Sequence, residues 1–388
     1  MSTTIYSTGS TSSGFSTNQR PLSMWSVLEK DYPRETPLTT FLAKMKSQER
    51  GRYQYYWSND AEVPYTITGL TAASSGDITN VTDYAYLRKF FILFNPRTGE
   101  AMQLIGSNPS STTIDGTLGV TRGIMGTAAS ILPTDVLLIL PAEYEEGSES
   151  SETLTAVNTE DYNYMSILQH AVKTTKSAAA EDTYFGETKR QESQRKLLRE
   201  WKIKCEMKYW FGERRNTATA GGLYTRGFGG VYDFLNTGTN RFEVDGVLTE
   251  QMFRSHLRDV WTAHPGDVNV AFFGSPDVIG VVEDWAADKI RTSVNADKYG
   301  YNIKSYRGVF DIDLVPVPLF AATDTTNEMG FLLDMSQFKA CHLRGRAPVM
   351  EKGVQIPVAD YYLDIIRGEL GLYRFNEKRH SMLTGIAA

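Results

Sequence analysis

The spacing of apolar residues changes along this chain, and the change predicts where strands and helices lie. From about residue 53 to residue 140, apolar side chains recur at every second position in short runs, as at Val63, Tyr65 and Ile67. This period is typical of strands that bury one face. Turn-forming residues separate the runs, as at Ser75-Gly76-Asp77 and Asn95-Pro96. We therefore predict a β-rich excursion built from hairpins.

One long helix is the clearest single element that the pattern predicts. Residues 185–213 contain no proline, and Glu192/Lys196 stands in the orientation that favours a helical ion pair. At about 1.5 Å per residue the helix would be roughly 40 Å long. Residues 187–196 include no apolar side chain, whereas residues 197–209 carry an apolar stripe at helical spacing. One half should therefore pack in a core, and the other should face solvent or a polar surface.

Shorter elements surround these two features. An amphipathic helix is predicted after Pro37, with Leu38, Phe41, Leu42 and Met45 as its apolar positions. Beyond residue 230 helices and strands alternate. The expected helices are 249–261 and 275–290, and the expected strands are 268–273, 309–317, 331–333 and 361–372. This order predicts an α+β fold class.

Length and cysteine content narrow the class of protein. A chain of 388 residues can bury one large core or two modest ones without disulfides. Only Cys205 and Cys341 occur, which excludes a disulfide scaffold and a cysteine-rich zinc site. We expect both to be buried apolar thiols.

Charge and hydropathy exclude other classes. The formal net charge is −6, from 40 basic and 46 acidic residues, whereas domains that read DNA sequence are usually basic. A mildly acidic protein can still enclose DNA, because like charge prevents adhesion to phosphates. No secretory signal is visible, and the densest apolar run, 136–140, is too short to cross a bilayer. We therefore expect a soluble intracellular product with no membrane partner.

The first twenty residues have an unusual composition. Eleven are Ser or Thr, and the large apolar side chains Ile5, Tyr6 and Phe15 are isolated. Such a segment cannot bury enough apolar surface to fold alone. It is either a disordered tail or an arm that becomes ordered only against a neighbouring subunit.

Two runs of opposite charge form a further candidate contact. The acidic run is Glu143, Glu145, Glu146, Glu149 and Glu152, and residues 189–208 of the predicted helix hold eight Lys or Arg against three Glu. Each run is ordinarily a solvated surface. Our hypothesis is that the acidic run of one copy faces the basic helix of another. The candidate inter-subunit contact residues are Ile5, Tyr6, Phe15, Glu143, Glu145, Glu146, Glu149, Lys189, Arg190, Arg195 and Arg199.

The search for catalytic chemistry finds little. The five histidines do not show the spacing of a helical zinc site, and no nucleophile-elbow motif occurs. Residues 221–230 are expected to form a glycine-rich loop, but they lack the Gly-Lys-Ser/Thr ending of a phosphate-binding loop. Asp311 and Asp313 should share one face of a strand, which is more simply a polar sheet face than a metal site. We therefore assign no catalytic, cofactor-binding or metal-binding residues and expect no cofactor.

The order of these parts, and several short stretches, resemble a known family. The stretches are Arg122-Gly123-Ile124-Met125-Gly126-Thr127, Asn163-Tyr164-Met165-Ser166-Ile167, Gly330-Phe331-Leu332-Leu333-Asp334-Met335, and Gly368-Glu369-Leu370-Gly371-Leu372 followed by Asn376 and His380. Together they are similar to the major capsid proteins of tailed bacteriophages, which have the Hong Kong 97 type of fold. The resemblance covers most of residues 30–385.

The resemblance implies five parts in this chain. They are an N-terminal arm with a short helix (1–52), a β-rich extended loop (53–152), a peripheral domain with the long spine helix (153–247), an axial domain (248–350) and C-terminal strands (351–388). We could not map the lysine and asparagine that cross-link some family members, and therefore predict no covalent cross-linking.

The expected function is an icosahedral head shell that encloses double-stranded DNA. The resemblance implies hexamers and pentamers of the chain, assembled in the host cytoplasm. A portal protein and, as an optional partner, a decoration protein are expected, and DNA should be contacted non-specifically. A separate scaffolding protein is expected if the chain is complete, because no long charged helical segment precedes the arm. The alternatives are another virion protein, such as a tail-tube or decoration protein, and a soluble enzyme that uses residues 221–230 with Asp311 and Asp313.

Overall fold

The structure, a computed structural model, describes most of the chain beyond residue 33. The described residues are 34–45, 47–59, 64–68, 78–82, 84–106, 112–114, 119–144, 158–180, 189–219, 221–236, 240–263, 270–285, 290–293, 303–307, 311–354 and 359–387. The chain divides into a main unit, residues 1–59 and 160–388, and an inserted unit, residues 60–159.

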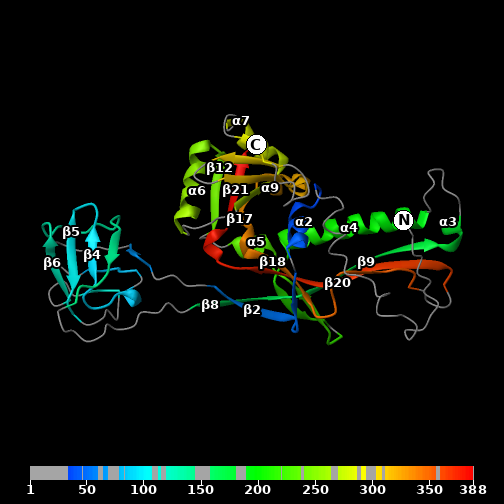
Figure 1. Ribbon diagram of the computed structural model, residues 1–388, viewed down its shortest axis with the longest axis horizontal. Coiled ribbons are helices and arrows are strands. Elements are labelled where there is room, and N and C mark those ends of the chain that lie inside the picture. Colours follow the sequence, from blue (N-terminus) through cyan, green and yellow to red (C-terminus); the bar gives the residue numbers. More distant parts are fainter. Residues whose placement is uncertain are drawn as a thin grey trace. The chain divides into compact units, whose positions relative to one another are not determined.

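A seven-stranded mixed sheet forms one half of the main unit (Figure 1). Its strands, in spatial order, are β12 (Arg241–Val247), β21 (Ser381–Ala387), β17 (Gly330–Asp334), β13 (Val270–Gly274), β16 (Asp311–Pro316), β15 (Ile303–Arg307) and β14 (Ile290–Ser293). The central strand β13 pairs in parallel with β16 and antiparallel with β17. Every residue of β13 is buried, as expected for a strand covered on both faces.

The seven-stranded sheet separates two hydrophobic cores. Ala271 and Phe273 of β13 point into the core that includes the long helix, and Val270 and Phe272 point into the other. The second core is closed by α6 (Glu250–Ala263) and α7 (Pro276–Trp285). Alternate residues of one strand thus serve opposite cores, because successive side chains of a strand point to opposite faces.

A second sheet of five strands forms the other half of the main unit. Its strands are β1 (Gln48–Arg50), β18 (Phe338–Leu343), β20 (Tyr361–Arg374), β19 (Val349–Glu351) and β9 (Ser166–Thr175). β9 pairs with β20 over its full length, from Ser166 opposite Leu370 to Thr175 opposite Tyr361. These two strands form a long antiparallel ribbon, which we call the β9–β20 ribbon.

The long helix α4 (Lys189–Phe211) joins the two halves. Its second half packs in the first core, where Trp201 and Trp210 are fully buried. Phe273, Phe320 and Phe331 surround the Trp210 ring, with centroids between 4.9 and 5.3 Å away. Such aromatic contacts add to the free energy gained by burial.

A buried carboxylate of α4 caps the short helix α2 (Pro37–Lys44). Glu206 accepts hydrogen bonds from the backbone N–H of Leu38 (3.1 Å) and of Thr39 (2.6 Å), and from Trp210 Nε1 (2.9 Å). Burial raises the pKa of Glu206, and these three hydrogen bonds oppose that rise. The contact supplies acceptors for N–H groups that have no partner within α2 itself.

The remaining helical segments of the main unit are short. They are α3 (Lys176–Ala180), α5 (Val231–Leu235), α9 (Asp324–Asn327), and the 3₁₀ turns η4 (Pro318–Ala322), η5 (Met335–Gln337) and η6 (Glu377–Arg379). Among the described residues no helix is both long enough and apolar enough to span a membrane.

The inserted unit has a core of its own. Its sheet has the order β3 (Thr66–Ile67), β7 (Leu137–Leu140), β4 (Ile92–Asn95), β5 (Glu100–Leu104) and β6 (Val120–Met125), and the turn η2 (Tyr84–Tyr86) follows β3 in the chain. Leu93, Met102 and Leu137 line one sheet face together with Ile78 and Ile114. The unit is therefore a small folded body and not only a set of hairpins.

Two ion pairs tie the loops of the inserted unit to its sheet. Arg122 Nε lies 2.6 Å from Glu100 Oε1, and both side chains are almost fully buried. Arg97 Nε lies close to Asp135 Oδ1, and hydrogen bonds from Arg97 lower the pKa of Asp135 despite the opposing effect of burial. Removal of one partner would leave a charge unpaired, which is costly in a buried site.

Most predicted elements are confirmed, and two predictions are wrong. The helices expected at residues 185–213, after Pro37 and at 249–261 correspond to α4, α2 and α6. The helix expected at 275–290 ends at Trp285, and Ile290 begins β14, because pairing with Tyr306 of β15 overrides the local helical pattern. The glycine-rich residues 221–230 do not form one loop, since Tyr224–Gly227 is a strand (β11) paired with β10 (Arg215–Ala218).

The buried His256 makes stability of the main unit depend on pH. His256 Nε2 of α6 lies 2.7 Å from Ser381 Oγ of β21, and burial lowers the pKa of His256 to about 4 despite Asp259. In the unfolded chain His256 is therefore protonated as the pH falls below about 6.5, whereas in the folded chain it stays neutral until about pH 4. The free energy of unfolding should fall by about 2–3 kcal/mol as the pH drops from about 6.5 to about 4.

This expectation can be checked by urea unfolding of the unassembled chain at several pH values. His256→Gln keeps a partner for Ser381 but removes the proton uptake, so its stability should fall less over that range. Part of the slope should remain, because burial also lowers the pKa of His342. Identical slopes in the original chain and the variant would contradict this assignment.

Candidate functional site

The polar half of α4 lies along the β9–β20 ribbon of its own chain (Figure 1). Arg190 and Gln194, one turn apart on the helix, both donate to the carboxylate of Asp364 on β20, at 2.8 Å. The Arg190 guanidinium also lies 4.3 Å from the centre of the Tyr362 ring. The helix is thus held against the ribbon by charge and by a cation–π contact.

Asp364 is the centre of this contact. It is almost fully buried and also accepts a hydrogen bond from the N–H of Gly353 at 2.6 Å. Burial alone would raise the pKa of Asp364, but hydrogen bonds from Arg190, Gln194 and Gly353 outweigh burial and lower it. The carboxylate therefore stays ionised and holds α4, β20 and the segment before β20 together.

The predicted basic contact residues are only partly directed outward. Lys189 and Arg195 are exposed on α4, whereas Arg190 forms an ion pair with Asp364. Arg199 is paired with Glu35 of the same chain, with Nε 2.7 Å from Oε2. The polar half therefore meets a polar surface as predicted, and carboxylates of its own chain supply part of that surface.

The acidic and N-terminal candidates are mostly outside the described part of the chain. Glu143 is exposed in the inserted unit. The other candidates lie outside the described residues: Ile5, Tyr6, Phe15, Glu145, Glu146 and Glu149.

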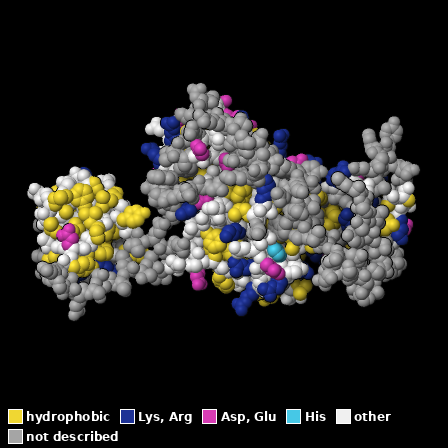
Figure 2. All heavy atoms as spheres, in the orientation of Figure 1, with side chains coloured by type: hydrophobic (Ala, Val, Ile, Leu, Met, Phe, Trp, Pro, Cys, Tyr) yellow, Lys and Arg dark blue, Asp and Glu magenta, His cyan; other side chains and the backbone are white. Residues whose placement is uncertain are grey.

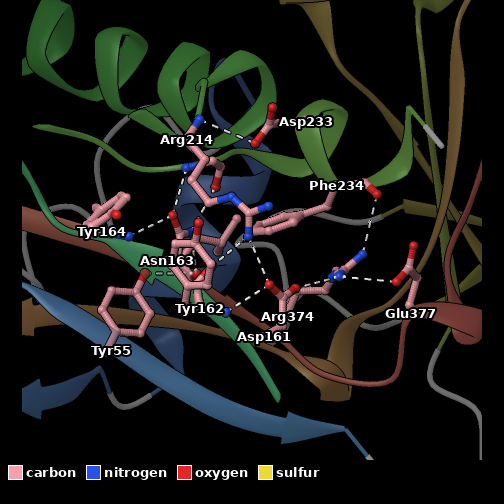
Figure 3. A network of polar contacts seen from close by, with 12 residues as sticks. Tyr55, Asp161, Tyr162, Asn163, Tyr164, Arg214, Asp233, Phe234, Arg374 and Glu377 are labelled. Atoms are coloured by element: carbon pink, nitrogen blue, oxygen red, sulfur yellow. Dashed lines mark hydrogen bonds and ion pairs between the residues drawn. The ribbon is translucent and has the colours of Figure 1, made fainter. Parts of the chain in front are cut away.

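A second polar site lies where the chain leaves and re-enters the main unit. Strands β2 (Gln54–Asn59) and β8 (Thr159–Tyr164) pair with each other there and form the stem of the insertion. Figure 3 shows the side chains of β8 that face the body of the main unit, together with Arg214 and Arg374. We call this group the stem network.

Asn163 is the buried centre of the stem network. Its Nδ2 donates to the carbonyl oxygens of Gly229 (3.1 Å) and Leu372 (3.0 Å), and its Oδ1 accepts from the N–H of Gly229 (2.9 Å). The Tyr55 hydroxyl of β2 donates to the same Leu372 oxygen at 3.0 Å. One amide therefore joins the stem to the segment after β11 and to β20.

Charged groups flank this amide (Figure 3). Arg374 is nearly buried, donates to Asp161 at 3.1 Å and lies 4.5 Å from the centre of the Phe234 ring. Burial lowers the pKa of Arg374, while Glu377 and Asp161 oppose that change. Arg214 also donates to Asp161 at 2.9 Å. The carboxylate of Asp161 thus bridges two arginines from distant parts of the chain.

Gly229 and Gly230, at the end of residues 221–230, serve close packing beside this network. A Cβ atom at Gly230 would lie 2.6 Å from the carbonyl oxygen of Tyr209, and one at Gly229 would lie 2.5 Å from Asp233 Oδ2. Only glycine lets the backbone approach α4 and α5 so closely. The space that a phosphate group would need at these glycines is therefore filled by the protein itself.

The histidines and the Asp311/Asp313 pair were the other candidates for chemistry, and His264 lies outside the described residues. His170, His256, His342 and His380 each contact a side chain or backbone group of the main unit. Asp311 is exposed and Asp313 is buried in β16. Within the described ranges, no group of three or more His, Cys, Asp or Glu residues is placed to hold a metal ion.

Both cysteines are free and buried, as predicted. Burial raises the pKa of Cys341 to about 12 and raises that of Cys205 as well. Thiols of this kind are poor nucleophiles, because the reactive form is the thiolate.

Comparison with known families decides the class of the protein. The model of the family described as SU10 major capsid protein matches residues 10–387. The chain belongs to this family. It is therefore a major capsid protein, a structural subunit of a virus shell, and the predicted resemblance to major capsid proteins is confirmed.

Solved structures show more distant likenesses. The holo-SrpI encapsulin complex from Synechococcus elongatus PCC 7942 is 11% identical over 59% of this chain and 76% of that chain, with a TM-score of 0.43. The capsid of Myoviridae phage XM1 is 10% identical over 63% and 81%, also at 0.43. The procapsid of satellite phage P4 is 11% identical over 68% and 81%, at 0.37. No curated protein sequence matches the chain.

Sequence reasoning missed the stem network of this capsid protein. Asn163 was noticed only within a family-like stretch, and Asp161 and Arg374 were not noticed at all. Asp161 and Asn163 are two residues apart on β8 and so share a strand face. That spacing was visible, but their partners lie up to 213 residues away in the sequence.

Loss of the Asn163 amide should weaken the main unit. Asn163→Ala removes the three hydrogen bonds to Gly229 and Leu372 and leaves buried backbone groups without them, at a cost of about 2–4 kcal/mol. Urea unfolding of the unassembled chain, followed by tryptophan fluorescence, measures this loss.

A matched control is Asn216→Ala, because Asn216 is an asparagine of β10 in the same unit with an exposed side chain. It should change stability by less than about 0.5 kcal/mol. Equal effects of the two substitutions would contradict the role assigned to Asn163.

Proposed function

We propose that this capsid protein builds the icosahedral head shell of a tailed bacteriophage around packaged double-stranded DNA, as hexamers and pentamers of one chain. The observation that carries the proposal is the match of the SU10 family model to residues 10–387, nearly the whole chain. The chain itself would be the main partner.

The architecture of the main unit supports a role as a shell subunit. The β9–β20 ribbon and α4 form a long element that is held together by contacts within its own chain, such as Arg190 with Asp364. A pre-organised element loses little conformational entropy when it contacts a neighbour. Many modest contacts of this kind, linked through the same subunits, give a stable shell by raising the effective concentration.

We infer further partners from the proposed role as a shell subunit, and no single binding site on the chain identifies them. We propose a separate scaffolding protein, a portal protein and, as an optional partner, a decoration protein, with assembly in the host cytoplasm. The net charge of −6 suits a wall that encloses DNA without adhering to it. We propose no catalytic activity, in line with the packed glycines at 229 and 230.

Overproduction of the full chain alone tests the proposal. Negative-stain microscopy of the purified material should show closed shells, or sheets and tubes of hexameric units. Only small closed oligomers, with activity towards a small-molecule substrate, would support the enzyme alternative instead.

The contact between the acidic run and the basic helix remains a proposal for assembly. Lys189 and Arg195 are exposed on α4, and Glu143 is exposed at the start of the acidic run. The double substitution Glu145→Lys/Glu146→Lys should reduce shell yield, and more strongly at low than at high salt. Exposed charges are screened beyond about 10 Å at 0.1 M salt.

A control with the same change of net charge is Glu328→Lys/Glu351→Lys, at two exposed positions of the main unit. Light scattering during assembly at two salt concentrations gives the comparison. If the two double variants respond alike, the acidic run is not a specific contact.

A further inference from the structure

The hairpin of β10 and β11 carries charge of one sign only. Residues 214–227 contain three arginines, Arg214, Arg215 and Arg226, and no acidic residue. The other polar side chains of the hairpin are one asparagine, one tyrosine and three threonines, all of which can donate hydrogen bonds. The whole chain has a net charge of −6, so the basic hairpin is a local exception.

The hairpin is exposed along its length. All four residues of β10 are exposed, and Tyr224 of β11 is exposed to 61%. At the tip, the N–H of Thr219 donates to the carbonyl oxygen of Leu223 at 2.6 Å, and the N–H of Gly222 donates to that of Thr219 at 2.9 Å. Gly222 has a φ of +75°, which glycine adopts without strain. The hairpin is therefore a well-formed ribbon of two strands whose two faces are both accessible.

One face of the hairpin brings two cations together. Arg215 lies opposite Gly227, and Thr217 lies opposite Thr225, so their side chains share a face. A Cβ atom at Gly227 would lie 3.1 Å from Arg215 Cγ and 3.4 Å from Lys208 Nζ. Burial and the nearby Arg215 lower the pKa of Lys208, although two carboxylates oppose the change. Within the described part of the chain, neither cation forms an ion pair.

The opposite face carries another cation in a fixed position. Arg226 lies opposite Asn216, and its guanidinium lies 4.0 Å from the centre of the Tyr53 ring. A guanidinium stacked on a ring keeps the N–H groups at its edge available to donate. Arg226 forms no ion pair with any described residue. Tyr224, opposite Ala218, extends the same face.

The base of the hairpin is held by the stem network. Arg214 donates to Asp161 at 2.9 Å, and its guanidinium lies 4.6 Å from the centre of the Tyr162 ring. Figure 2 shows Lys and Arg side chains, in dark blue, gathered on this side of the main unit near the strand that Figure 1 labels β2. A ribbon held at its base loses little conformational entropy when it binds a partner.

Duplex DNA fits the hairpin better than a protein surface does. DNA phosphates are anionic and regularly spaced, and they accept hydrogen bonds from Arg, Lys, Thr and Tyr side chains. A ribbon of two strands is also narrow enough to enter the major groove. A protein partner would need an apolar centre to its contact, and Leu223 is the one large aliphatic side chain of the hairpin.

We propose that the β10–β11 hairpin contacts the duplex DNA enclosed by the shell, through phosphate groups and without reading the base sequence. Lys208 and Arg215 would bind phosphate from one face of the ribbon, and Arg226 would bind it from the other. The inference rests on the proposed function, and it names the surface that meets the DNA. Because the chain as a whole is acidic, the contact is weak and depends strongly on salt.

Binding of a short duplex to the dissociated full-length chain tests the proposal. Fluorescence anisotropy at a series of salt concentrations gives the affinity and its dependence on salt. Arg215→Gln/Arg226→Gln should reduce the slope of log affinity against log salt by about 2, because each phosphate contact contributes about 0.9. Arg215→Lys/Arg226→Lys keeps both charges and should retain most of the slope.

A matched control is Arg258→Gln/Lys352→Gln, which removes two cations at exposed positions elsewhere in the main unit. This control should leave the slope unchanged. Equal losses of slope in the two glutamine double variants would show that the hairpin is not a specific DNA contact. Absence of DNA binding by the original chain would also overturn the proposal.

Thiol labelling tests the same contact inside the shell. Thr217→Cys places a thiol on the hairpin, and both native cysteines are buried and give a low background. Shells are assembled from the purified variant with and without short duplex DNA enclosed, and both are treated with a maleimide reagent. We expect labelling to be several-fold slower in the shells that enclose DNA.

Two results in shells would overturn the proposal. Equal labelling that is fast with and without DNA would mean that the hairpin does not meet the DNA. Protection in both kinds of shell would mean that a second copy of the chain covers the hairpin. Failure to form any shell would instead contradict the proposed function, and the anisotropy comparison would still decide whether the hairpin binds DNA.

Discussion

The packing of one half of α4 is the interaction on which the rest of the main unit depends. Trp201 and Trp210 are buried between the two sheets, and they fix the direction in which the helix leaves the core. The polar half is then carried along the β9–β20 ribbon, where Arg190 and Gln194 meet Asp364. The apolar half of α4 thus packs in the first hydrophobic core, and its polar half contacts the β9–β20 ribbon, which lies largely outside that core.

The same helix holds two other segments of the main unit against it. Glu206 caps α2, which brings the N-terminal region to α4, and the end of α4 leads to the closely packed Gly229 and Gly230. Asn163 binds that glycine segment and β20 at once. The stem of the insertion is therefore attached, through buried hydrogen bonds, to the strand that supports the helix.

Local sequence patterns predicted the helices and strands that bury one apolar face. These elements also pack against segments that are near in the sequence. The apolar stripe from Leu197 onward and the alternation in residues 53–140 are examples, and the family-like stretches predicted the capsid fold. β9 was missed although Leu168 and Val172 alternate with Gln169 and Lys173, because the apolar signal is weak where half of each strand face is polar. The stem network could not be predicted, since Asn163 binds partners 66 and 209 residues away. The partners of Arg190 and Arg199 were missed for the same reason: a charged side chain does not reveal which distant carboxylate it meets.

The proposed assembly of copies of this chain into a shell can be tested on the purified protein. Sedimentation velocity of the purified full-length chain, free of nucleic acid and of other proteins, tests it most directly. We expect a fast-sedimenting species far larger than any small ring, in equilibrium with capsomers. A single sharp boundary for a monomer or small closed oligomer, unchanged over a wide range of concentration and salt, would contradict it.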